Sequence, residues 1–104
     1  MMIKDSIGDP ALLEQFAEEC NELVQASLKY ARKLRGENPT PKMIDEIRED
    51  FWGEIADVFV CIDGLESAHL IDHRYVNDVK EEKIRRWYER IKEREYERKN
   101  GRNL

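Results

Sequence analysis

Two pairs of acidic residues occur in the same sequence frame. The pattern Phe-x-x-Glu-x-x-acid-aliphatic begins at Phe16 and again at Phe51. Residues three apart are neighbours on a helix surface, so each pair follows one shoulder of an apolar helix face. If the two helices pack antiparallel, the carboxylates converge, and their mutual repulsion favours a cation between them. The four acids are Glu19, Glu22, Glu54 and Asp57. Carboxylate oxygens suit Mg²⁺, which usually joins protein carboxylates to substrate phosphates.

A second group of candidate residues is basic and lies in the last third of the chain. Lys83 falls between Val79 and Trp87 on the apolar stripe of a predicted helix, and Lys80 and Arg86 flank it. A lysine in this position either covers a partner helix with its stem or meets an anion. The second interpretation predicts cations that face a phosphate ester, with lysine as a point charge and arginine as a fork.

The order of these motifs resembles that of the MazG-like nucleotide pyrophosphohydrolases. Glu18-Glu19-x-x-Glu22 and Glu54-x-x-Asp57 match the family's EExxE and ExxD motifs, and the similarity covers roughly residues 12–90. The resemblance implies an all-α, Mg²⁺-dependent enzyme, with Mn²⁺ as a substitute, that converts nucleoside triphosphates to monophosphates and pyrophosphate. It implies metal binding by Glu19, Glu22, Glu54 and Asp57, proton acceptance by Glu22 or Glu18, and phosphate binding by Lys80, Lys83, Arg86 and Asn77.

Two departures from the family pattern affect these expectations. The separation between Glu22 and Glu54 is long for the family, which predicts an extra turn or loop around residues 39–50. Glu81 and Glu82 stand where the family often has an asparagine, and Asn77 is the nearest candidate for it.

Helix signals predict three helical segments. Asp9 is expected as an N-cap with Pro10 at the first helical position, and Gly36 is expected to end this helix. Its predicted apolar stripe comprises Leu12, Phe16, Cys20, Leu23, Ser27, Tyr30 and Leu34. Thr40 and Pro41 are expected to open a second helix, in which Gly53 marks either a kink or a break. Its predicted stripe comprises Ile44, Ile47, Phe51, Ile55, Val58, Ile62 and Leu65.

The third helix is expected to begin after Asp72, as its N-cap, and to run from His73 to about Arg98. The predicted fold class is all-α: an antiparallel bundle of three to four helices. We expect one domain over residues 1–104, with its core in 9–98 and residues 99–104 frayed.

Composition limits the class of protein. The 104 residues are 39% charged and 40% hydrophobic, which suits a soluble protein with a modest core, and we expect a homodimer or homotetramer. No run of about 18 apolar residues and no signal-peptide stretch occurs, so we expect a cytoplasmic protein without a membrane span. Two cysteines are too few for a disulfide scaffold, and we interpret both as buried thiols. Residues 80–104 carry a net +4, but their mixed signs favour a solvated helix face over nucleic-acid binding.

Alternative interpretations remain open from the sequence. A related all-α pyrophosphatase would act on dUTP or phosphoribosyl-ATP, and a non-catalytic helical interaction module would leave the acids merely solvated. Trp52 is a candidate either for stacking on a base or for burial in a subunit contact. Glu66-x-x-His69 matches half of a di-iron signature, but the sequence lacks the second motif that such a site needs.

Overall fold

The protein is entirely helical where its structure is described. A computed structural model describes residues 7–37 and 41–101. It contains α2 (Asp9–Arg35), α3 (Ile44–Ser67) and α4 (His73–Lys99), and no strand occurs within these described ranges. The predicted all-α class is confirmed.

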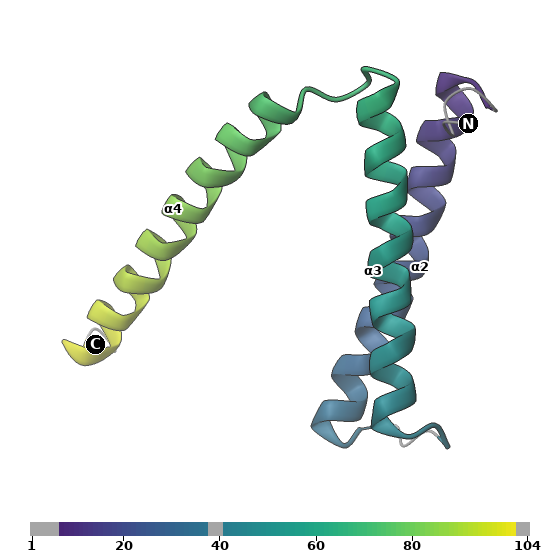
Figure 1. Cartoon of the computed structure of the whole chain (residues 1–104). Helices are drawn as coiled ribbons and strands as arrows, with labels where there is room; N and C mark the ends of the chain where they lie inside the picture. The colour runs from purple at the N-terminus through teal and green to yellow at the C-terminus, as the bar shows by residue number, and fades with distance from the viewer. Residues whose placement is uncertain (1–6, 38–40, 102–104) are drawn as a thin grey trace. The chain divides into compact units, whose positions relative to one another are not determined.

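Two compact units divide the chain. The first comprises Met1–Ile71 and the second Asp72–Leu104. In the first unit α2 and α3 pack together as an antiparallel hairpin (Figure 1). The second unit is α4, which is described by itself below. Within the described residues, no helix is long and apolar enough to cross a membrane.

The core of the hairpin is small. Its buried hydrophobic residues are Leu12, Ile47, Val58, Cys61 and Leu65. Most of the predicted stripe of α2 is buried or half-buried, from Leu12 to Tyr30, and the rings of Tyr30 and Phe51 lie 5.5 Å apart across the helix pair. The prediction for Leu34 is wrong, because it is 67% exposed. Leu34 lies in the last turn of α2, beside the connection to α3, where little of the partner helix is available to cover it.

The two ends of α2 differ in how well the sequence predicted them. Gly8 is the N-cap and Asp9 already lies within the helix, so the predicted Asp9 cap is wrong by one residue. Asp9 still places a negative charge in the first turn, where the helix dipole favours it. Gly36 ends the helix as predicted, with a φ of 74°, which a glycine adopts without strain. The N–H groups of Gly36 and Glu37 donate to the carbonyl oxygens of Lys33 and Arg32.

Helix α3 begins later than predicted. Met43 is its N-cap, so Pro41 is not the first helical residue; Thr40 lies outside the described residues. The Glu46 carboxylate accepts a hydrogen bond from the Met43 N–H at 3.2 Å, which satisfies one of the free donors at the helix start. The helix continues through Gly53 without a break.

Helix α4 agrees with its predicted bounds. The Asp72 side chain accepts a hydrogen bond from the Tyr75 N–H at 3.1 Å and caps the helix as predicted. None of the residues of α4 is buried within the described chain, and Val76, Ile84, Trp87 and Ile91 are among its exposed apolar residues. Lys99 is still helical, Asn100 and Gly101 form a turn, and residues 102–104, expected to fray, lie outside the described part.

Candidate metal centre and its groove

Three carboxylates converge between α2 and α3. Glu19 and Glu22 extend from α2 and Glu54 extends from α3, and each offers an oxygen atom such that these atoms all lie within 4.8 Å of one another. Asp57 lies one turn further along α3 and is not a member of this group of three. The geometry brings together three of the four acids that the repeated sequence frame singled out.

The oxygen atoms of this cluster are only partly satisfied by the protein. Gln15 Nε2 donates a hydrogen bond to Glu19 Oε1 at 2.8 Å. The second oxygens, Glu19 Oε2 and Glu54 Oε2, are buried and have no hydrogen-bond partner among the described residues. A buried anionic oxygen without a partner is unfavourable, so these atoms favour either a proton or a cation beside them.

The electrostatics of Glu54 reflect this crowding. Removal from solvent raises the pKa of its carboxyl group above the ordinary value, and the charges of Glu22, Asp57 and Glu19 raise it further. The buried Cys61 thiol has its pKa raised mainly by burial, with a contribution from the nearby charge of Glu19. Negative charge is therefore concentrated on this part of the hairpin.

The donor set fits a hard divalent cation. All three converging groups are carboxylates, and two of them hold a buried oxygen with no partner within the described chain. Mg²⁺ binds oxygen ligands and usually retains several waters or substrate phosphate oxygens in addition to one or two carboxylates. Because Glu22 and Glu54 line an open groove, room remains for such additional ligands.

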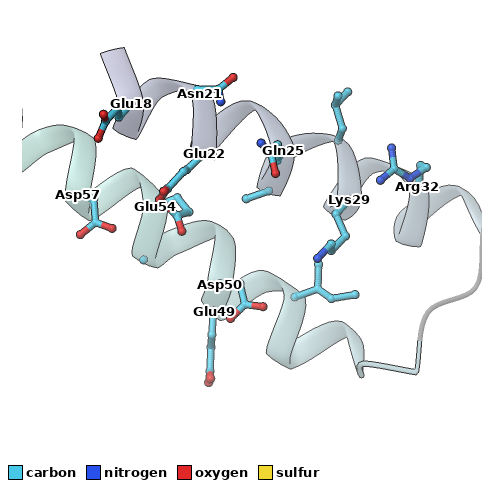
Figure 2. A pocket seen from close by; sticks show the side chains of 14 residues that line it. Glu18, Asn21, Glu22, Gln25, Lys29, Arg32, Glu49, Asp50, Glu54 and Asp57 are labelled. Carbon is cyan, nitrogen blue, oxygen red and sulfur yellow. The ribbon is translucent and has the colours of Figure 1, made fainter. Parts of the chain in front are cut away.

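Two members of the acidic cluster, Glu22 and Glu54, line a groove of about 970 Å³ between α2 and α3, whereas Glu19 does not line it (Figure 2). This volume lies in the range of small-molecule binding sites. Glu22, Glu54 and Asp57 lie towards one end of the groove, and Glu18 also lines it, as an exposed side chain. Gly53 also lines the α3 wall, where an added Cβ would contact nothing within 4 Å. Glu22, Glu54 and Asp57 therefore face an open groove and not a closed core.

Other residues singled out from the sequence lie outside this groove lining. Trp52 is 57% exposed, and the guanidinium carbon of Arg48 lies 5.4 Å from the centre of its ring. The phosphate-binding candidates Asn77, Lys80, Lys83 and Arg86 all belong to α4, where all four are exposed.

On α4 the predicted apolar stripe is present. Lys80 and Lys83 border an apolar hollow on this helix together with Val76, Val79, Ile84 and Trp87. Lys83 thus shares a face with the apolar residues, as its spacing predicts. Arg86 lies 3.9 Å from the carboxylate of Glu82.

The structure also places residues in the groove that sequence reasoning missed. These residues are Asn21, Gln25, Lys29 and Arg32, all on α2 (Figure 2). The signal that could have found them is their spacing, because polar residues recur every three or four positions from Glu18 onward. These residues continue the face of α2 that carries Glu18 and Glu22.

No protein family model, curated protein or solved structure matches this chain. The function proposed below therefore rests on the residues of the groove and on the resemblance of the acidic motifs.

Proposed function

We propose that the protein is a Mg²⁺-dependent nucleoside triphosphate pyrophosphohydrolase that releases a nucleoside monophosphate and pyrophosphate. The observation that carries the proposal is the convergence of Glu19, Glu22 and Glu54, with two buried oxygens that lack partners in the described chain, next to the groove that Glu22 and Glu54 line. The order of the acidic motifs, which resembles that of the MazG-like enzymes, supports the same function.

The roles of the acids follow from their positions. Glu19, Glu22 and Glu54 would hold the metal, and the hydrogen bond that Gln15 donates to Glu19 would orient this ligand. Asp57 adds negative charge one turn away. The chemistry that Mg²⁺ supplies when bound is neutralisation of phosphate charge and a lower pKa for a coordinated water. Glu18 or Glu22 would accept the proton of the attacking water, and both residues line the groove.

The contribution of α4 forms a second part of the proposal. Lys80, Lys83 and Arg86, with Asn77, would contact the phosphate chain, as the family resemblance implies. Positioning and electrostatic stabilisation supply most of the catalysis in phosphoryl transfer, so a small helical scaffold with these groups is sufficient.

We propose further that the active form is a homodimer or homotetramer. The hairpin has five buried hydrophobic side chains among its described residues, and it leaves Val24, Leu28 and Phe59 half exposed or more. On α4, Val76 and Trp87 are likewise exposed. Assembly with a second copy would cover apolar surface of this kind. Light scattering of the purified protein tests this proposal. A monomeric mass at micromolar concentration would contradict it.

The decisive experiment measures pyrophosphate release from a panel of ribo- and deoxynucleoside triphosphates, with Mg²⁺ and with EDTA. We expect Mg²⁺-dependent release that Glu54→Gln abolishes while the variant remains folded. Glu14→Gln is the matched control, because Glu14 is exposed and does not line the described groove. Including dUTP and phosphoribosyl-ATP in the panel tests whether the protein is instead one of the related pyrophosphatases that act on these substrates. Absence of release across the panel, with no stabilisation by Mg²⁺, would favour a non-catalytic interaction module.

A further inference from the structure

The groove between α2 and α3 changes its charge along its length. Its α2 wall begins with Glu18 and Glu22, continues with the amides of Asn21 and Gln25, and ends with two cations. These cations are Lys29 and Arg32 (Figure 2). The acidic cluster therefore occupies one part of the groove and a basic pair occupies another.

The side chains of Lys29 and Arg32 make no hydrogen bond or ion pair within residues 7–37 and 41–101. Nearby basic residues behave differently: Arg35 pairs with Glu37 at 2.9 Å and Arg48 pairs with Asp45 at 2.6 Å. In a chain in which 39% of residues are charged, two unpaired cations on the wall of one groove are available to a ligand.

Within the described residues, no acid on the opposite wall forms an ion pair with Lys29 or Arg32. Asp50 lines the groove from α3, but its carboxylate is held by Lys42, with Nζ and Oδ2 2.7 Å apart. This contact raises the pKa of Lys42, so the lysine stays charged. Glu49 also borders the groove, and in Figure 2 its carboxylate points away from α2 while Lys29 points towards α3.

The spacing along α2 sets the size of ligand that could contact both ends. Lys29 follows Glu22 by seven residues, about 10 Å along the helix axis, and Arg32 follows it by ten, about 15 Å. Long helical side chains lean towards the helix N-terminus, so both cationic groups lean back towards the acidic cluster. A chain of two or three linked phosphates fits this separation, whereas a single phosphate held at the metal would not reach the basic pair.

We infer that Lys29 and Arg32 form an anion subsite for the part of a polyphosphate chain that lies away from the metal. Its identity as a substrate subsite rests on the proposed function. The subsite selects ligands with two or more linked phosphates over monophosphates, so it distinguishes a nucleoside triphosphate from the monophosphate product. Arginine supplies a planar fork for phosphate oxygens and lysine supplies a point charge.

Calorimetric titration with inorganic tripolyphosphate tests the subsite on the full chain, once with Mg²⁺ and once with EDTA. We expect Lys29→Gln and Arg32→Gln each to weaken binding about ten-fold, because each removes a charge-assisted contact. Arg35→Gln is the matched control, since Arg35 is on the same helix, pairs with Glu37 and does not line the described groove. Orthophosphate should bind weakly to all four proteins.

Mn²⁺ binding, followed by electron paramagnetic resonance, separates this inference from the proposed function. We expect the two variants to bind Mn²⁺ as tightly as the unaltered protein. If all four proteins bind tripolyphosphate equally tightly, the inference of the subsite is wrong, and the proposed metal site is not affected by this result. If tripolyphosphate binds in EDTA and both variants weaken this binding, the subsite is supported even if Mn²⁺ does not bind. No tripolyphosphate binding in either buffer overturns it.

Discussion

Gln15 donates a hydrogen bond from Nε2 to Glu19 Oε1 at 2.8 Å, across one turn of α2. The bond occupies one oxygen of Glu19 and leaves Oε2 buried without a partner in the described chain. A group that orients a metal ligand in this way typically contributes 10–100-fold to metal affinity. We therefore expect Gln15→Ala to weaken Mn²⁺ binding about ten-fold. Paramagnetic resonance titration measures this effect.

The control for this prediction is Glu14→Ala, which changes an exposed residue next to Gln15 that does not line the described groove. This variant should leave the Mn²⁺ affinity within two-fold of that of the unaltered protein, since Glu14 is not one of the converging carboxylates and salt screens its exposed charge. Equal affinities for Gln15→Ala and Glu14→Ala would show that the hydrogen bond does not organise the site.

Charge crowding at Glu54 predicts a pH-dependent stability. Its pKa is raised from the ordinary 4.5, first by burial and then by the charges of Glu22, Asp57 and Glu19. The folded state thus holds this proton more tightly than the unfolded state. The ionised carboxylate destabilises the fold above the raised pKa, and protonation removes this penalty as the pH falls through it.

In EDTA, we expect Glu54→Gln to melt at a higher temperature than the unaltered protein at pH 7–8. The difference should shrink as the pH is lowered towards 4.5, because the unaltered Glu54 becomes neutral. Mg²⁺ should stabilise the unaltered protein and have little effect on the variant. Thermal melts over this pH range measure all three effects, and a variant less stable at pH 8 in EDTA would argue against repulsion at the site.

The repeated sequence frame predicted that four acids would converge, and Glu19, Glu22 and Glu54 do so, because helical periodicity sets which face a residue occupies. The same periodicity predicted the burial of Leu12 and Val58. These predictions depend only on helix geometry and on antiparallel packing, which a short connection between the helices imposes.

Features that depend on competing local contacts were less predictable. The N-cap of α3 falls at Met43, a residue type that cap preferences do not favour, where the Glu46 side chain accepts a hydrogen bond from the Met43 N–H. The basic end of the groove was missed because Lys29 and Arg32 resemble solvated surface residues in the sequence. Only the three-dimensional arrangement shows that they lack partners in the described chain while Arg35 and Arg48 have them.

Gly53 gives a prediction about stability. It lies inside the continuous helix α3, where glycine is less favourable than alanine by about 1 kcal/mol. A Cβ added at this position would contact nothing within 4 Å. We expect Gly53→Ala to raise the free energy of unfolding by about 1 kcal/mol, measured by urea denaturation. Unchanged Mn²⁺ affinity would show that the methyl group leaves the acidic cluster intact. A lower free energy of unfolding for Gly53→Ala would contradict the prediction.

The two cysteines should differ in reactivity. Cys61 is 9% exposed, and burial raises the pKa of its thiol, with further contributions from the charges of Glu19, Cys20 and Asp57. Cys20 is only half-buried. Because the thiolate is the reactive form, we expect iodoacetamide to alkylate Cys20 at least ten-fold faster than Cys61 at pH 8. Peptide mass spectrometry over time measures both rates on the same sample.

Cys20→Ser provides the control, since it should leave only a slowly reacting thiol in the folded protein. In concentrated urea the two cysteines should react at similar rates, because unfolding removes both the burial and the ordered negative charge that suppress the Cys61 thiolate. Equal rates in the folded protein would mean that the end of the hairpin around Cys61 opens readily. Slow alkylation of Cys61 would instead show that α2 and α3 remain packed beside the acidic cluster, which the metal site requires.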